Sequence, residues 1–337
     1  MTRRAVIIGG SGQIGRAVAA NLLAHGWSVT SAQRHPDQLP DSLRGRVDTV
    51  ALDRTETGLA AALGEGADLL VDTVAFTAVH AAQLLEIQGD VGALSVISTG
   101  SVYSDAQGRT MDEARETGFP QYPVPIPETQ PRTKPSPASY STHKVAMEDT
   151  LLAGARNVTV LRPCAIYGPG CRSPREWWFL KRLLDGRRRI PLSDRGENRF
   201  HTSATANIAE LVRVAAEQPG VRALNAADPQ ALSVAGIGRA MMQAVGRDAE
   251  LDLIDGPPNG LVGVTPWSVA GPLVVDMSAA QALGYRPVTD YAGFVGETCR
   301  DLAERAAAQP WREAFPGLTP YPDAMFEYAA EDAAGHG

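Results

Sequence analysis

The chain has 337 residues, 44% of them hydrophobic and 20% charged, which allows about two domains or one α/β domain with a smaller lobe. Its formal net charge of −7 argues against a nucleic-acid-binding protein, which needs a basic face. The three cysteines have no metal-ligand spacing, and no apolar run reaches the roughly 18 residues of a membrane span. Because the apolar stretch Ala5–Ile8 is too short for a signal peptide, we expect a cytoplasmic protein.

Short apolar runs alternate with helical patterns in the first half of the chain. Strands are expected at Ala5–Ile8, Ser28–Ala32, Val47–Leu52, Leu69–Ala75, Leu94–Thr99 and Val158–Arg162. Helices are expected at Arg16–His25, after the fourth strand to about Ile87, and at Tyr140–Leu152. This alternation predicts an α/β fold with a Rossmann-type, doubly wound parallel sheet.

Residues 104–139 interrupt this rhythm with seven prolines, and a loop of this length is usually functional or disordered. Beyond Pro163 the pattern is irregular. Helices are expected at 175–184, 207–217, 233–245 and 291–307, and a strand at 222–225. We expect residues 1–163 and about 200–228 to form the Rossmann domain and about 164–199 and 229–325 a smaller substrate-binding lobe. Residues 326–337 are expected to be a flexible tail.

A glycine-rich turn lies between the first strand and the first helix. It reads Gly9-Gly10-Ser11-Gly12-Gln13-Ile14-Gly15. Glycines at 9, 12 and 15 allow the tight turn, the approach of the backbone to a pyrophosphate and the packing of helix on strand. The helix N-terminus then offers N–H groups to an anion. Because strand, turn and helix are all in place, the motif predicts a dinucleotide site.

The choice between NAD and NADP depends on the end of the second strand. No carboxylate that could bind a ribose 2′-hydroxyl follows until Asp37, whereas Arg34 could pair with a 2′-phosphate. We therefore prefer NADP to NAD, with Arg34 as an ordinary exposed arginine the alternative. Asp53 could accept a hydrogen bond from the adenine amino group, or could simply begin a turn.

Tyr140 and Lys144 are four residues apart on an expected helix and so share one face. A free tyrosine has a pKa near 10, and a nearby ammonium favours the phenolate. The pair can therefore exchange a proton with a hydroxyl/carbonyl couple. The spacing is common by chance, but here it follows a strand whose end, Ser98-Thr99-Gly100-Ser101, places hydroxyls at the ligand-binding edge of the sheet.

These motifs together resemble the extended short-chain dehydrogenase/reductases, the NAD-dependent epimerase/dehydratase family. The matching segments are the glycine turn, the segment ending Val102-Tyr103, Tyr140-Ser-Thr-His-Lys144 and Leu161-Arg-Pro-Cys-Ala-Ile-Tyr-Gly-Pro-Gly170. The resemblance implies a catalytic triad of Thr99, Tyr140 and Lys144, with Ser98 and Ser101 as fallback choices for the hydroxyl. It also implies a homodimer, and cofactor contacts from Gly9, Gly12, Gln13, Ile14, Gly15, Arg34, Asp53, Arg54, Ala75, Lys144 and Pro163.

Substrate contacts are expected from Ser101, Trp178 and Arg199. Trp178 could stack on a ring-shaped substrate or pack a lobe helix onto the core. The acidic pair of the sugar-nucleotide dehydratases is replaced by Gly100 and Ser101, so water elimination is not expected.

Three functions remain open. We favour an NAD(P)-dependent oxidoreductase or epimerase that acts by hydride transfer on a secondary alcohol or ketone of a sugar-like or other small polar molecule. The first alternative is a net NADPH-dependent carbonyl reductase. The second, from another class, is a non-catalytic member of the same fold that senses the nucleotide or binds RNA.

Overall fold

The computed structural model describes residues 2–55 and 58–335, and the chain divides into two compact units. Unit 1 contains residues 1–164, 205–227 and 275–288. Unit 2 contains residues 165–204, 228–274 and 289–337. Residues 275–288 thus join the sheet-containing unit, although the sequence analysis places them in the lobe.

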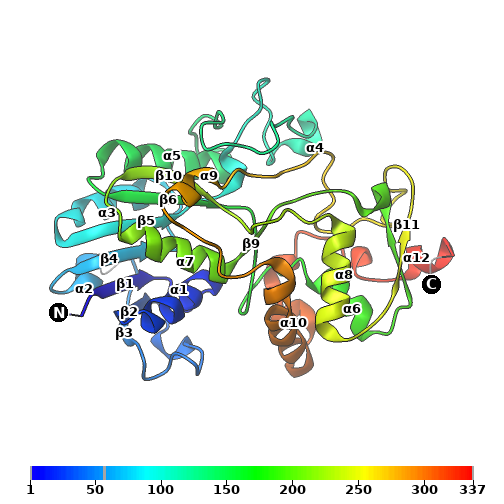
Figure 1. Cartoon of the computed structure of the whole chain (residues 1–337), viewed down its shortest axis with the longest axis horizontal. Coiled ribbons are helices and arrows are strands. Elements are labelled where there is room, and N and C mark those ends of the chain that lie inside the picture. Colours follow the sequence, from blue (N-terminus) through cyan, green and yellow to red (C-terminus); the bar gives the residue numbers. More distant parts are fainter. Residues whose placement is uncertain (1, 56–57, 336–337) are drawn as a thin grey trace. The chain divides into compact units, whose positions relative to one another are not determined.

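Unit 1 is built on a seven-stranded parallel sheet with the strand order β10-β6-β5-β4-β1-β2-β3 (Figure 1). The strands are β1 (Arg4–Ile8), β2 (Ser28–Gln33), β3 (Asp48–Ala51), β4 (Ala67–Asp72), β5 (Val91–Ile97), β6 (Val158–Pro163) and β10 (Val221–Ala226). The expected Rossmann-type fold class is confirmed. Because the chain order reverses between β1 and β4, the loops after these two strands form the switch point where such sheets bind ligands.

Helices cover both faces of this sheet. Helix α1 (Gln13–Ala24) packs against α7 (Thr205–Ala216), and α3 (Ala78–Glu86) packs against α5 (Tyr140–Gly154), on opposite faces (Figure 1). The short helices are α2 (Ala60–Leu63), α4 (Ala114–Thr117) and α9 (Ser278–Ala282). Leu84 of α3 and Leu151 of α5 join the sheet residues Val96 and Val160 in one buried cluster. Burial of these apolar side chains fixes α5 on the sheet and so places Tyr140 at its carboxyl edge.

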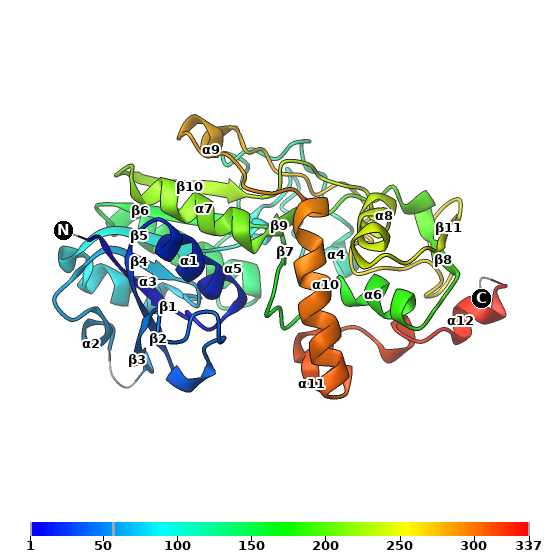
Figure 2. The same ribbon diagram turned by 60° about the horizontal axis from the view of Figure 1, so that its bottom comes forward.

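Unit 2 combines two small parallel strand pairs with helices (Figure 2). The strands are β7 (Ala165–Tyr167) with β9 (Thr202–Ala204), and β8 (Arg189–Leu192) with β11 (Glu250–Leu253). The helices are α6 (Trp177–Leu184), α8 (Val234–Val245), α10 (Tyr291–Ala308), α11 (Trp311–Ala314) and α12 (Ala329–Ala333). Large aromatic side chains, Trp178, Phe179, Trp267 and Phe315 among them, fill its core. Within the described residues no helix is both long and apolar enough to span a membrane.

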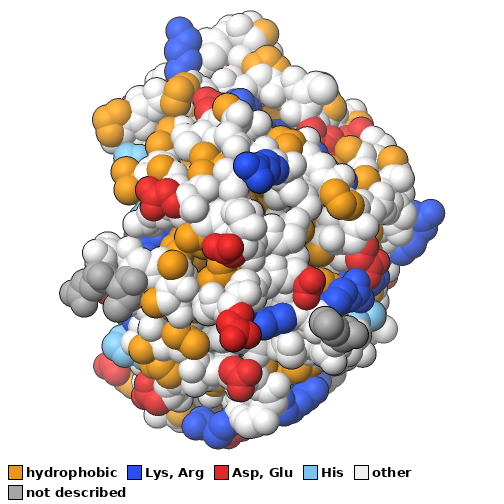
Figure 3. Space-filling model, turned by 90° about the vertical axis from the view of Figure 1, so that its left-hand side faces the viewer, with side chains coloured by type: hydrophobic (Ala, Val, Ile, Leu, Met, Phe, Trp, Pro, Cys, Tyr) orange, Lys and Arg blue, Asp and Glu red, His pale blue; other side chains and the backbone are white. Residues whose placement is uncertain are grey.

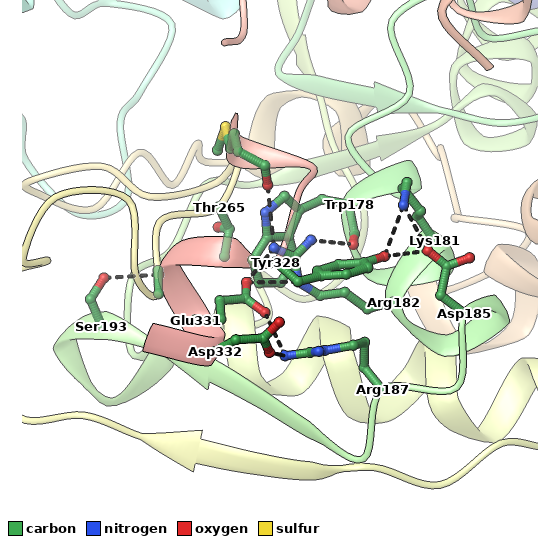
Figure 4. A network of polar contacts seen from close by, with 12 residues as sticks. Trp178, Lys181, Arg182, Asp185, Arg187, Ser193, Thr265, Tyr328, Glu331 and Asp332 are labelled. Atoms are coloured by element: carbon green, nitrogen blue, oxygen red, sulfur yellow. Dashed lines mark hydrogen bonds and ion pairs between the residues drawn. The ribbon is translucent and has the colours of Figure 1, made fainter. Parts of the chain in front are cut away.

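The C-terminal segment differs from the expected flexible tail over residues 326–337, of which residues up to 335 are described. Helix α12 carries Glu331, which is 3% exposed and pairs with the buried Arg182 of α6 (Figure 4). Tyr328, just before α12, donates from its hydroxyl to Asp185 at 2.5 Å. A buried carboxylate needs a charged partner. The C-terminal segment is therefore held on α6 by a specific ion pair, which its sequence of small and acidic residues does not predict.

Candidate active site

The glycine turn after β1 has the shape of an anion site. Gly9 has a φ of +83°, which favours glycine. A Cβ on Gly15 would lie 2.3 Å from the carbonyl oxygen of Gly9, so only glycine lets α1 start this close to the turn. A Cβ on Gly12 would meet only that oxygen, at 3.3 Å, which leaves its other side open. Gly12 occupies the N-cap position of α1 and has no side chain, and no side-chain cap is found among the described residues. The first N–H groups of α1 therefore remain available to a phosphate.

The residues expected near the adenosine lie at the ends of β2 and β3. Arg34 follows Gln33, the last residue of β2, and is exposed. Asp53 accepts hydrogen bonds from the hydroxyl and the N–H of Thr55 at 2.6 and 2.9 Å. Together with the nearby Arg34 charge, these bonds lower the pKa of Asp53. An ionised Asp53 can accept a hydrogen bond from an amino group.

Arg54 is engaged within the protein. Its guanidinium pairs with Asp72 at 3.0 Å and donates to Gln83 at 3.0 Å and to the carbonyl of His80 at 3.4 Å. These contacts brace β4 against α3, and the Arg54 carbonyl accepts from Gln83 at 3.2 Å. The expected contact of Arg54 with the cofactor stays a prediction.

Asp72, at the end of β4, was missed by the sequence analysis. Its side chain is fully buried and accepts the N–H groups of Val74 and Ala75 at 2.9 and 2.7 Å. These bonds fold the turn after β4 tightly and hold the peptide that carries the Ala75 carbonyl. That carbonyl accepts a hydrogen bond from Lys144 Nζ at 2.7 Å, so Asp72 helps to place the lysine.

Thr99, Tyr140 and Lys144 come together at the carboxyl edge of β5. Thr99 lies close to Tyr140, whose pKa it lowers, and its hydroxyl lies 2.8 Å from the hydroxyl of Ser101. Lys144 Nζ lies 6.0 Å from the centre of the Tyr140 ring. Ser98, a fallback choice, is 3% exposed and its hydroxyl has no hydrogen-bond partner among the described residues. The geometry therefore favours Thr99 as the hydroxyl that meets Tyr140.

Helix α5 presents Tyr140 from its first turn. Ser139 and Thr142 form a reciprocal capping box that fixes where the helix begins. The Tyr140 ring packs on Phe76, with a centroid distance of 5.6 Å, and Phe76 in turn packs on His143 at 5.0 Å. Phe76 follows the turn after β4, and the sequence analysis did not identify it as a neighbour of Tyr140. The aromatic contact orients a side chain that is otherwise 49% exposed.

The protonation of Tyr140 and Lys144 follows from their surroundings. Burial lowers the pKa of Lys144 to about 8, although the charges of Asp72 and Glu148 oppose this. Desolvation raises the pKa of Tyr140, the nearby Thr99 side chain lowers it, and the charge of Asp112 raises it further. The Lys144 ammonium donates to the carbonyls of Ala75 and Ile97, at 2.7 and 2.8 Å. That Lys144 favours the phenolate of Tyr140 stays a prediction.

A buried polar network supports the triad from behind. Tyr103, fully buried, donates to Asn225 at 2.6 Å and accepts from Arg162 at 3.2 Å. Arg162 is paired with the buried Glu148 of α5 at 2.7 Å. The network thus links α5 to β6 and β10. Burial raises the pKa of Tyr103 well above 10, so this tyrosine stays protonated and has a structural role.

Membership of a known family follows from this arrangement and from one comparison. The model of the NAD dependent epimerase/dehydratase family matches residues 5–227. The chain belongs to this family. It is therefore an enzyme of the extended short-chain dehydrogenase/reductase type, as the motifs predict. The search of curated proteins gives no match.

Solved structures of the same fold resemble this epimerase/dehydratase family member. WbmH from Bordetella bronchiseptica, in complex with NAD+, shares 18% identity with a TM-score of 0.67 over 90% of this chain and 99% of its own. A UDP-N-acetylglucosamine 4-epimerase from Methanobrevibacter ruminantium shares 16% identity with a TM-score of 0.66 over 90% and 99%. A UDP-glucose 4-epimerase from Thermotoga maritima shares 18% with a TM-score of 0.64 over 89% and 99%.

Two expected substrate contacts of this family member lie in unit 2, and one of them is wrong. Trp178 is completely buried, with the guanidinium of Arg182 3.6 Å from its ring centre (Figure 4). It packs the lobe helix α6 onto the core and has no free face for a substrate. Arg199 is exposed, and its guanidinium donates to the carbonyl of Ala231 at 3.1 Å. It stays a prediction.

Proposed function

We propose that this enzyme is an NAD(P)-dependent oxidoreductase or epimerase that acts by hydride transfer on a secondary alcohol or ketone of a sugar-like or other small polar molecule. The observation that carries the proposal is the arrangement of Thr99, Tyr140 and Lys144 at the carboxyl edge of β5, where Thr99 lies close to Tyr140 and Lys144 Nζ lies 6.0 Å from the centre of the Tyr140 ring. The family match supports the nicotinamide cofactor, and the open glycine turn supports its diphosphate.

In this proposal each residue of the triad has one task. Thr99 donates to the substrate oxygen and fixes its place. Tyr140 gives a proton to that oxygen when a ketone is reduced and takes it back when an alcohol is oxidised. Lys144 holds its ammonium beside Tyr140 and towards the cofactor site. A bound nicotinamide dinucleotide supplies and accepts the hydride, which is chemistry that the protein itself lacks.

Gly100 and Ser101 support redox chemistry without water elimination. They follow Thr99 directly, where a dehydratase of this family would carry its acidic pair. Ser101 offers only a hydroxyl, which is bonded to Thr99. We therefore favour an epimerase, which oxidises and then reduces the same carbon, or a net reductase, which completes only one half of that cycle.

For the cofactor we propose NADP, held at its 2′-phosphate by Arg34. The support is an exposed guanidinium directly after β2, with glutamine in place of an acid at the strand end. Calorimetry should show that Arg34→Ala weakens NADPH binding about tenfold or more and leaves NADH binding unchanged, since a charge-assisted hydrogen bond is lost. Arg46→Ala, which removes another exposed arginine, is the matched control. Equal weakening of both nucleotides by Arg34→Ala would point to NAD.

The test of the catalytic proposal is Tyr140→Phe. We expect turnover to fall about 10²–10⁴-fold, because the proton donor is lost while the ring packing remains. Structural neighbours are described with UDP-sugars, so nucleotide sugars are the first substrates to assay, followed by NADPH-dependent reduction of small ketones. Tyr321→Phe, in unit 2, is the control. Unchanged turnover in Tyr140→Phe would contradict the assignment.

The nucleotide released on denaturing the purified protein separates the two redox subtypes. Retained NAD would favour an epimerase and contradict our NADP preference. An empty protein that binds NADPH much better than NADH would favour a net carbonyl reductase that uses Arg34.

The non-catalytic alternative predicts a different outcome. If the chain only sensed a nucleotide or bound RNA, Tyr140→Phe would leave its function unchanged. RNA binding requires clustered basic side chains, whereas acidic and basic groups are interspersed on the face shown in Figure 3.

We also propose a homodimer, which light scattering of the purified protein tests directly.

A further inference from the structure

The long loop after β5 is ordered by specific hydrogen bonds and contacts the helix that carries Tyr140. Asp105 is the centre of its fold: its buried carboxylate accepts the N–H groups of Gln107, Arg109 and Gln121, each at 2.9 Å, and pairs with the Arg109 side chain at 2.7 Å. These bonds outweigh burial and lower the pKa of Asp105 to about 2, so the carboxylate stays charged. Residues 105–121 are thereby closed into a loop whose far end is held in place.

Asp112 lies in that loop and contacts the helix that carries Tyr140. Its Oδ2 accepts the N–H of Ser141 at 2.8 Å, in the first turn of α5. The capping oxygen of Ser139 serves the next N–H, that of Thr142. The first turn of α5 is thus capped both by its own residue Ser139 and by Asp112 of the loop. The second oxygen, Oδ1, has no hydrogen-bond partner among the described residues.

Because Asp112 accepts a hydrogen bond from the residue directly after Tyr140, its carboxylate places a negative charge near Tyr140. This charge opposes the formation of the phenolate, and it acts in the same direction as desolvation, whereas Thr99 acts in the opposite direction. Other titratable groups near Asp112 and Tyr140 are Tyr122 of the same loop, on which the Asp112 charge also acts, and His143 and Lys144 on α5. Around the lysine lie Asp72 of β4, His80 of α3 and Glu148 of α5.

We propose that Asp112 is a positioning residue that the inserted loop delivers to α5 to keep Tyr140 in its protonated, proton-donating form. This inference rests on the proposed function, in which Tyr140 is the acid and base. A protonated Tyr140 serves ketone reduction: its proton passes to the substrate oxygen while the carbonyl carbon accepts the hydride of a reduced nicotinamide dinucleotide. The loop would then keep the enzyme in the form that reduces a ketone up to a higher pH, and removing the charge of Asp112 should move the upper pH limit of reduction downward.

The experiment compares Asp112→Asn with the unaltered chain, since asparagine keeps an oxygen for the Ser141 N–H and removes the charge. The phenolate fraction of Tyr140 is followed by NMR of protein labelled at tyrosine Cζ and saturated with whichever of NAD+ and NADP+ it binds. The Tyr140→Phe variant assigns the signal. At a fixed alkaline pH we expect Asp112→Asn to raise the phenolate-to-phenol ratio about threefold, the order expected for two unit charges in largely aqueous surroundings. Asp112→Glu should restore the original ratio.

Glu113→Gln is the matched control, because it removes the same charge from the adjacent exposed residue. An unchanged ratio in Asp112→Asn, or an equal rise in Glu113→Gln, would overturn the proposal. A rise in Asp112→Asn alone, reversed in Asp112→Glu, would support it. The measurement needs no substrate, so it is separate from the loss of turnover in Tyr140→Phe that tests the proposed function.

Discussion

Replacing Glu331 by Gln should destabilise unit 2 strongly, because it leaves a buried arginine without its anionic partner. The side chains of Arg182 and Glu331 are 2% and 4% exposed. Arg182 cannot turn to solvent, since it also donates to the carbonyl of Trp178 at 3.0 Å and stacks on that ring. Breaking a buried ion pair from one side costs about 3–5 kcal/mol. At about 2–4 °C per kcal/mol for a body of this size, the Tm should fall by roughly 6–20 °C.

Thermal unfolding followed by circular dichroism measures this effect. The matched control is Asp332→Asn, because the side chain of Asp332 is 52% exposed where it pairs with Arg187, and exposed pairs contribute about 0–1 kcal/mol. Combining Arg182→Met with Glu331→Leu should recover part of the loss, since both charges are then removed. Equally small effects of Glu331→Gln and Asp332→Asn, with unprotected amides over 329–333 in hydrogen exchange, would refute the buried pair and restore the flexible tail.

Two further predictions concern the cofactor site. Gly15→Ala should lower the free energy of unfolding by about 1–3 kcal/mol, because its Cβ would lie 2.3 Å from the Gly9 carbonyl oxygen. Gly12→Ala should keep the fold but weaken nucleotide binding. Urea unfolding measures the first effect and calorimetry the second. Cofactor binding that uses the charge of Lys144 should weaken as the pH rises through about 8, because the lysine becomes neutral above its lowered pKa. Calorimetry across pH 6.5–9.5 measures this, and Lys144→Met should show a weaker, flatter dependence.

The sheet of unit 1 could be predicted because its central strands are buried on both faces. Each strand of such a sheet is a short apolar run bounded by turn residues, and each expected run overlaps a β-strand of the structure, although three of them extend past its end. The strand pairs of unit 2 escaped the same approach. They have three or four residues each, and β8 contains a proline, so neither periodicity nor length distinguishes them from loops.

Burial explains why one substrate contact was wrongly assigned. Trp178 lies in the sequence Arg-Glu-Trp-Trp-Phe-Leu, where an exposed stacking residue and a core residue look alike. The deciding partner is Arg182, one helical turn later, whose charge is neutralised by Glu331, 149 residues away along the chain. No local pattern contains that pair. The same reason led us to expect a flexible tail, since Glu331 has the composition of a solvated residue until its partner is known.

The catalytic motif was accessible from the sequence, but the groups that adjust it were not. Tyr140 and Lys144 are linked by helical spacing, a rule that acts over four residues. Asp72 acts on Lys144 through a turn in another part of the sheet, and Asp112 reaches α5 across 29 residues of chain. Both are carboxylates whose influence depends on where the loops close. If Asp112 does hold Tyr140 protonated, the inserted loop sets the pH up to which the enzyme keeps its proton-donating form, and relatives that share the triad but lack this carboxylate should lose that form at a lower pH.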